Sequence, residues 1–81
     1  MKTPEVVEAI VRTVAPYLGE AMARAATLGH CRKLGISEAE MTREEADALL
    51  SQIGLGLNVF LGRKRSSEVL LAMRSAIGEG P

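Results

Sequence analysis

The sequence predicts an all-α protein, a compact bundle of four to five helices in a single domain over residues 1–81. Apolar residues recur every three or four positions along most of the chain, which is the spacing of one face of a helix. Residue types that begin and end helices flank these stretches. The composition is 47% hydrophobic, yet only Tyr17 and Phe60 are aromatic. We therefore expect one modest core built from aliphatic side chains.

The N-terminal helical region begins at Thr3-Pro4, where a hydroxyl residue precedes a proline at the first helical position. Its apolar spacing then continues across Pro16 without a polar linker. A proline inside a helix removes one backbone donor and clashes with the carbonyl four residues earlier. Two structures are compatible with this pattern: a single kinked helix from residue 4 to about residue 34, or two helices that meet at Ala15-Pro16. We expect a kink or a very tight break at Pro16.

The middle of the chain carries helix stop and start signals in close succession. Leu34-Gly35 predicts a helix end. Two overlapping matches to the capping box follow, SEAE at residues 37–40 and TREE at residues 42–45. We expect a short turn here and then a helix that begins at Thr42.

The segment IGLGLNVFLGRKR, residues 53–65, allows two structures. Its helical periodicity continues to Leu61, but Gly54 and Gly56 each destabilise a helix by about 1 kcal/mol relative to alanine. A helix is the preferred prediction, and a loop or a short strand over residues 54–61 is the alternative.

A final helix is expected after the basic residues. Ser66 or Ser67 would cap it, and Gly78 would end it. The residues expected to face the core from the last two helices are Ala46, Leu49, Leu50, Ile53, Leu57, Phe60, Leu61, Val69, Leu70, Met73, Ala76 and Ile77.

Small residues are candidates for close contacts between helices or between chains. Ala21, Ala25 and Gly29 are spaced four apart in the second helical region, and Gly54 ends a similar row in the third. Small side chains at this spacing let helix backbones approach each other closely. Such packing would offset the cost of a glycine within a helix. We therefore predict that these four residues take part in an interaction surface.

The charges sum to zero but are segregated along the chain. Residues 37–50 hold five anions and one cation, whereas residues 51–81 hold four cations and two anions. Zero net charge gives no bulk attraction to nucleic acid or to an anionic membrane. A bipolar charge distribution favours self-association or a charged protein partner.

Three consecutive cations, Arg63, Lys64 and Arg65, form the strongest basic cluster. Five residues rather than four separate Gly56 from Gly62, so the spacing does not fit a phosphate-binding loop. The cluster is typical of a solvated helix end, where cations suit the helix dipole. The alternative is a contact to nucleic-acid phosphates.

His30-Cys31 is the one adjacent pair with catalytic chemistry. On a helix the two side chains point about 100° apart, so they cannot act together as a nucleophile and its base. With one His and one Cys in the chain, we expect no metal site and no cofactor. LGHCRKLG, residues 28–35, resembles the active-site helix of histidine-phosphotransfer domains, in which Lys and Gly follow the phosphoacceptor His. The resemblance implies that His30 would accept the phosphoryl group, although Lys33 and Gly35 follow it at three and five positions.

The number of cysteines and the length of the apolar runs indicate the cellular compartment of the protein. A single cysteine cannot form an intrachain disulfide, and the N-terminus does not look like a signal peptide. The longest uncharged run, residues 48–62, is shorter than the roughly 20 residues that span a bilayer. We expect a cytoplasmic protein without a membrane span.

The sequence thus predicts a small non-enzymatic helical module for protein–protein interaction or regulation, which forms a homodimer or binds a protein partner. The rich aliphatic content for so small a domain favours a core shared between chains. Two alternatives are a nucleic-acid-binding regulator that uses the cluster at residues 63–65 and a phosphotransfer protein that uses His30.

Overall fold

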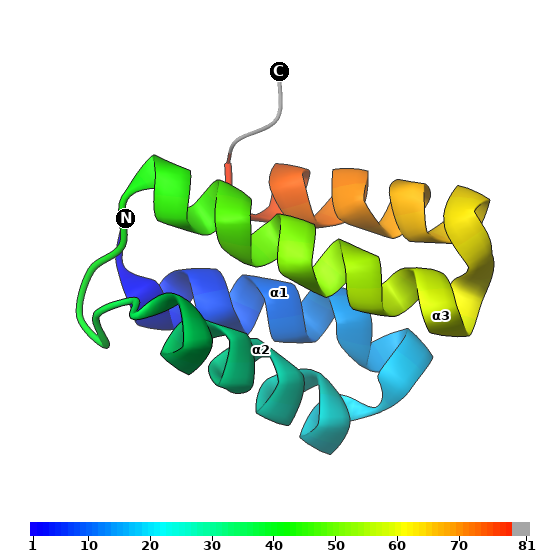
Figure 1. Cartoon of the computed structure of the whole chain (residues 1–81), viewed down its shortest axis with the longest axis horizontal. Coiled ribbons are helices and arrows are strands. Elements are labelled where there is room, and N and C mark those ends of the chain that lie inside the picture. Colours follow the sequence, from blue (N-terminus) through cyan, green and yellow to red (C-terminus); the bar gives the residue numbers. More distant parts are fainter. Residues whose placement is uncertain (79–81) are drawn as a thin grey trace.

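The computed structural model describes residues 1–78, which form three helices: α1 (Thr3–Leu18), α2 (Glu20–Leu34) and α3 (Arg43–Ala76) (Figure 1). The predicted all-α class is confirmed, and the last residues of the predicted domain, 79–81, lie outside the described part. α3 reverses direction at Gly62, where φ is 81° and ψ is 163°. Its first arm (residues 43–61) and second arm (residues 63–76) lie side by side.

The predicted number of helices, four to five, is wrong, because the described residues form three. Residues 37–40 match a capping box but form no helix: the chain bends at residues 38 and 39, Glu40 forms an isolated antiparallel bridge with Lys2, and the Ala39 N–H donates to the Ser37 hydroxyl at 3.2 Å. No separate helix begins at Ser66 or Ser67, because Gly62 is the one residue with non-helical angles within α3. The last expected helix is therefore the second arm of α3.

The break expected at Pro16 is misplaced. α1 continues through Pro16 and ends at Leu18, and the chain turns at Gly19, with φ 85° and ψ 150°. Pro16 lies in the last turn of α1, where its side chain is exposed and the helix loses only one hydrogen bond. The angles of Gly19 lie in a region that only glycine adopts readily. The boundary between α1 and α2 is thus one glycine long.

Thr3 does not cap α1 as expected. Lys2 occupies the N-cap position, and Thr3 is the first helical residue. The buried Thr3 hydroxyl donates to the Ser37 carbonyl at 2.7 Å, and the Thr3 N–H donates to the Ala39 carbonyl at 3.1 Å. These bonds fasten the start of α1 to the loop between α2 and α3.

Other local predictions are confirmed. α2 ends at Leu34, and Gly35 follows in the left-handed conformation with φ 68° and ψ 30°. Thr42 caps α3 through a complete capping box: its hydroxyl accepts the Glu45 N–H at 3.0 Å, and the Glu45 carboxylate accepts the Thr42 N–H at 2.9 Å. Residues 54–61 are helical, so the loop or strand alternative does not hold.

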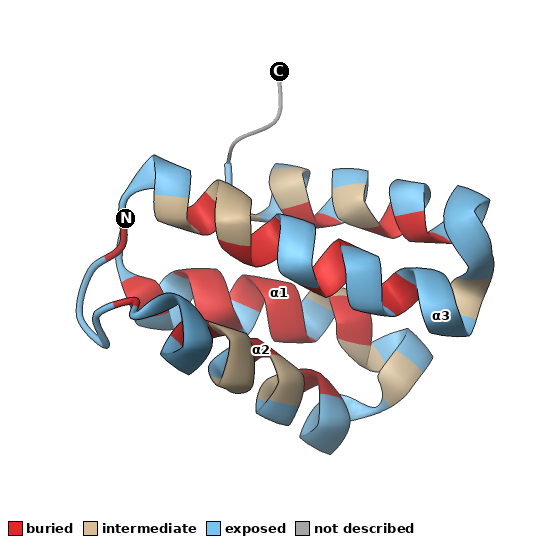
Figure 2. Ribbon diagram, viewed as in Figure 1, coloured by how far each residue is buried: buried red, intermediate tan, exposed pale blue. Residues whose placement is uncertain are grey.

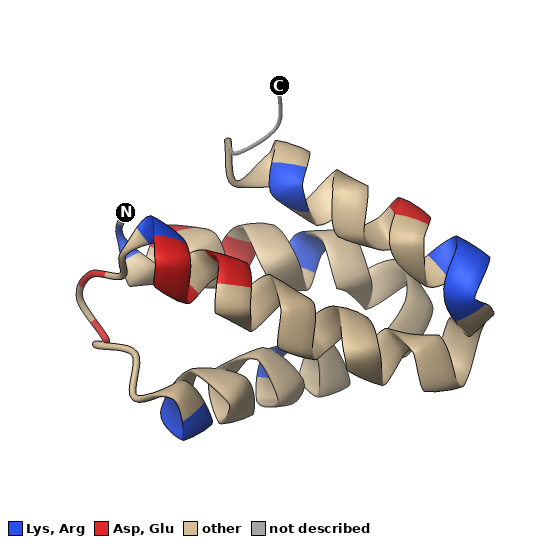
Figure 3. Ribbon diagram, turned by 45° about the horizontal axis from the view of Figure 1, so that its top comes forward, with Lys and Arg blue, Asp and Glu red and all other residues tan. Residues whose placement is uncertain are grey.

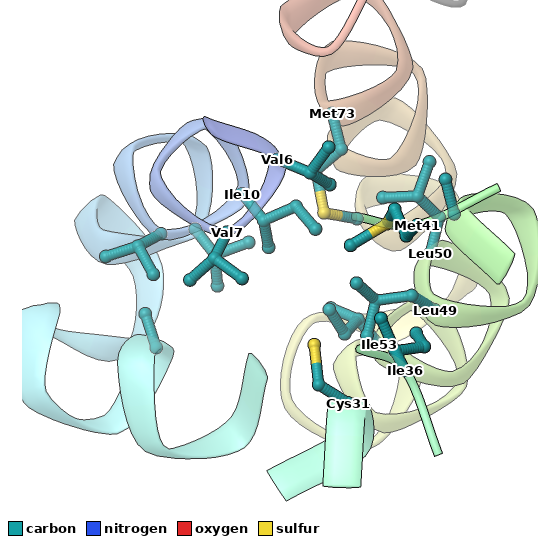
Figure 4. Close-up of a cluster of buried hydrophobic side chains, with 14 of the residues drawn as sticks. Val6, Val7, Ile10, Cys31, Ile36, Met41, Leu49, Leu50, Ile53 and Met73 are labelled. Atoms are coloured by element: carbon teal, nitrogen blue, oxygen red, sulfur yellow. The ribbon is translucent and has the colours of Figure 1, made fainter. Parts of the chain in front are cut away.

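The core is aliphatic, as predicted, and lies where the three helices meet (Figures 2 and 4). Ile10 of α1, Leu49 and Leu50 of the first arm and Met73 of the second arm are fully buried. Phe60 and Ala76 are exceptions: both were expected to face the core, but Phe60 is 65% exposed and Ala76 is exposed as well. Among residues 1–78 no helix has both the length and the apolar character that crossing a bilayer requires.

Candidate interaction surface

The most exposed large apolar side chains among the described residues lie on α3. Val59, Leu71, Phe60 and Leu55 are 84%, 67%, 65% and 63% exposed, more than any other large hydrophobic residue in residues 1–78. Single exposed apolar residues are normal, but several on one element mark an interaction surface. Leu55, Val59 and Leu71 fall outside the apolar stripe that faces the core, and this is the sequence feature that could have identified them.

A groove runs between the two arms of α3. The residues that line it are Ser51, Gly54, Leu55 and Asn58 of the first arm, with Arg63, Ser66, Ser67 and Leu70 of the second. Val59 follows Leu55 by four positions, so it lies on the same face of the first arm as Leu55. Leu71 follows Ser67 by four positions, so it lies on the same face of the second arm as Ser67. Val59 and Leu71 therefore lie on the faces that border the groove. We call Leu55, Val59, Leu70 and Leu71 the α3 surface.

The floor of the groove is fixed by a buried hydrogen bond between the arms. The Ser66 hydroxyl donates to the Gly54 carbonyl at 2.9 Å. Both groups are buried. A carbonyl oxygen has two lone pairs, so that of Gly54 can accept this bond in addition to its hydrogen bond within the helix. This bond and the burial of Val69 and Met73 hold the second arm against the first, so the α3 surface is carried by a rigid scaffold.

Opposite charges predominate at the two ends of the first arm of α3 (Figure 3). Arg63, Lys64 and Arg65 form the turn between the arms, which we call the basic turn, and all three are exposed. The first arm begins with the exposed Arg43, which is followed by the acidic Glu44, Glu45 and Asp47, so three anions and one cation lie at this end. The arm has 19 residues, so at 1.5 Å per residue these ends lie about 28 Å apart.

Some of these acidic groups already have partners. The Glu45 carboxylate completes the capping box, and Asp47 accepts a hydrogen bond from the Arg74 guanidinium at 2.7 Å, which ties the two arms together at the open end of the hairpin. Glu44 is exposed and has no hydrogen bond or ion pair with any described residue. Within residues 1–78 the three cations of the basic turn likewise form no ion pair.

The structure does not bring the four predicted small residues together. Ala21 and Ala25 are exposed on α2, and Gly29 is half-buried there. Gly54 is buried, but a Cβ built on it would lie 3.9 Å from both terminal methyl groups of Leu70, on the second arm of the same helix. Since 3.9 Å is an ordinary van der Waals distance, the packing does not require glycine at this position.

His30 and Cys31 lie near the C-terminal end of α2. Cys31 is buried in the core, and this burial raises the pKa of its thiol. His30 is half-buried and forms no side-chain hydrogen bond with a described residue. Over residues 1–78, no three His, Cys, Asp or Glu side chains are close enough to hold a metal ion.

An exposed ion pair joins α1 to α2. The Arg24 guanidinium donates two hydrogen bonds to the Glu8 carboxylate, one of them at 3.1 Å. Hydrogen bonding from Arg24 lowers the pKa of Glu8 below its ordinary value. The folded state therefore favours the charged form of Glu8 more strongly than the unfolded state does.

We expect Glu8→Gln to lower the urea midpoint of unfolding at pH 7 and to have little effect near pH 2.5. The stability from a carboxyl group with a lowered pKa is present above its unfolded pKa of about 4.3 and is lost as the pH falls through the folded pKa. Glu68→Gln is the matched control, because Glu68 forms no ion pair among residues 1–78. An effect of Glu8→Gln that is equal at both pH values would contradict the prediction.

Comparisons with protein-family models, with curated proteins and with solved structures found no match for this chain. The features of the surface itself are therefore the basis for a function. Its most distinctive feature is a groove on one helical hairpin that is bordered by exposed apolar side chains, with a basic turn at one end and a mainly acidic helix start at the other.

Proposed function

We propose that this protein is a small, non-enzymatic helical module for protein–protein interaction or regulation, which associates with itself in the cytoplasm. The observation that carries the proposal is the α3 surface. Leu55 and Val59 of the first arm and Leu71 of the second arm are each more than 60% exposed, and covering apolar area is the main favourable term in association.

The apolar character of the surface distinguishes this role from nucleic-acid binding. A nucleic-acid-binding regulator would use the same basic turn, Arg63, Lys64 and Arg65, to contact phosphates. Among residues 1–78, however, the side chains that continue from the turn along the groove are mainly apolar or uncharged. Together with zero net charge, this composition supports a protein partner over a polyanion.

Sedimentation velocity is expected to show self-association at a protein concentration of about 100 μM, where a dimer with a micromolar dissociation constant is saturated. Leu55→Lys combined with Leu71→Lys should give a monomer, because each lysine would place a charge within an apolar interface. Both side chains point into solvent, so the helix content measured by circular dichroism should be unchanged.

Met22→Lys is the matched control for this experiment. Met22 is an exposed apolar residue, but it lies on α2. The variant should self-associate as the wild-type chain does. A wild-type chain that sediments as a monomer at this concentration would overturn the proposed function.

A further inference from the structure

We propose that two copies pair antiparallel through their α3 surfaces, about a two-fold axis, so that the basic turn of each copy lies beside the acidic start of α3 in the other. This inference rests on the proposed function and adds to it the occupant of the groove and its orientation. The occupant is a second copy of this chain, and the argument for it is the complementarity of charges along one helix.

The centre of the pair follows from where the apolar side chains lie. Leu55 precedes Gly62 by seven residues and Leu71 follows it by nine, so both lie about 10–14 Å from the turn at 1.5 Å per residue. A two-fold interface uses the same patch on both copies, and residues near its axis meet their own counterparts. An axis at the level of Leu55 and Leu71 therefore places apolar side chains against apolar side chains.

The same axis determines which residues of one copy lie opposite the basic turn of the other copy. Within one copy, the basic turn lies about 10 Å from the axis on one side. By symmetry, the basic turn of the second copy lies about 10 Å from the axis on the other side. It is therefore level with the residue of the first copy that precedes Leu55 by seven positions. That level is Ala48, between Ser51 and Glu44. Residues 44, 48, 51 and 55 are spaced three or four apart and hence share one face of the first arm. The exposed carboxylate of Glu44 then lies within reach of a long cationic side chain from the second copy.

A parallel pairing would place like charges together. The two basic turns would be neighbours, with Arg63, Lys64 and Arg65 of each copy facing the same three cations. The two acidic helix starts would be neighbours as well. Like charges brought together at an interface oppose association, whereas complementary ends favour it and fix the register. The antiparallel arrangement is thus the one that the charges of α3 support.

Charge reversal tests the orientation. One variant carries Arg63→Glu and Lys64→Glu, which makes the turn acidic; the other carries Glu44→Lys and Ala48→Lys, which makes the start of α3 basic. Each variant alone should self-associate about tenfold more weakly or worse than wild type, because each replaces attraction with repulsion at both ends of the pair. An equimolar mixture of the two variants, and a chain that carries all four substitutions, should regain near wild-type affinity.

Sedimentation equilibrium measures these dissociation constants, and circular dichroism checks that each variant is folded. Arg32→Glu with Lys33→Glu, at the end of α2, is the control and should leave the dissociation constant unchanged. The quadruple variant separates a loss of folding from a loss of pairing, because it contains every substitution and is expected to associate.

The outcomes separate the two proposals. A wild-type monomer would overturn both of them. Wild-type self-association that neither charge reversal weakens would overturn the antiparallel arrangement and leave the proposed function intact. In a parallel pair, the chain with Arg63→Glu and Lys64→Glu would bind wild type more tightly than wild type binds itself, and this result would also overturn the inference.

Discussion

Replacing Leu49 with alanine is expected to lower the free energy of unfolding by about 2–5 kcal/mol, the range for removing a buried leucine side chain and leaving a cavity. Leu49 is fully buried. It lies on the first arm of α3, near Ile36, Ile53 and Cys31, in the part of the core between α2 and α3 (Figure 4). Urea unfolding followed by circular dichroism measures the change, and an unchanged slope of the transition would show that only stability has altered.

This loss is large compared with the whole stability of the domain. A chain of 81 residues has a free energy of unfolding of about 4–12 kcal/mol at the usual 0.05–0.15 kcal/mol per residue. Met22→Ala is the control, because Met22 is 54% exposed and an exposed substitution changes stability by only about 0.5 kcal/mol. Equal losses for the two variants would mean that Leu49 is not packed in the core as described.

Local sequence signals predicted the elements that local physics determines. The capping box of Thr42 and Glu45 and the glycine stop at Gly35 depend on residues within a few positions of each other, and both are present in the structure. The periodicity of apolar residues predicted the helical class and the aliphatic core, because it reports which face of a helix is buried. It also predicted helix over residues 54–61 in spite of two glycines.

The helix boundaries were harder to predict because they depend on backbone angles. Pro16 appeared to be the break, yet a proline in the last turn costs the helix little, and Gly19 makes the turn. Gly62 was one of several glycines in its segment, and the sequence does not indicate that it, rather than Gly54 or Gly56, adopts a non-helical conformation. The number of helices was wrong for this reason.

The candidate surface depends on contacts between elements that periodicity does not describe. Phe60 has the spacing of a core residue, yet it is 65% exposed. The spacing of apolar residues tells which way a side chain points from its helix, but it does not tell whether another element lies there to cover it. Gly54 was expected to contact a small residue on another helix, and instead it faces Leu70 and Ser66 of its own helix. Only the reversal at Gly62 places those residues opposite each other.

We expect Gly62→Ala to lower the free energy of unfolding by about 1–3 kcal/mol, the usual cost of holding a side-chain-bearing residue in a backbone region that favours glycine. Gly62 has φ 81° and ψ 163°. No atom of a neighbouring group lies within 4 Å of the place where the new Cβ would be. The cost would therefore come from the backbone and not from a clash, and urea unfolding measures it.

Two other glycines give matched comparisons for Gly62. Gly56 is helical and exposed and has open space around it, so Gly56→Ala should raise stability by up to about 1 kcal/mol. Gly35 has left-handed helical angles, φ 68° and ψ 30°, which asparagine tolerates. Gly35→Asn should thus be milder than Gly62→Asn, since the extended ψ of Gly62 lies outside the region that asparagine adopts. If Gly62→Ala were as stabilising as Gly56→Ala, the two arms of α3 would not be joined by the turn described, and the groove between them would lose its basis.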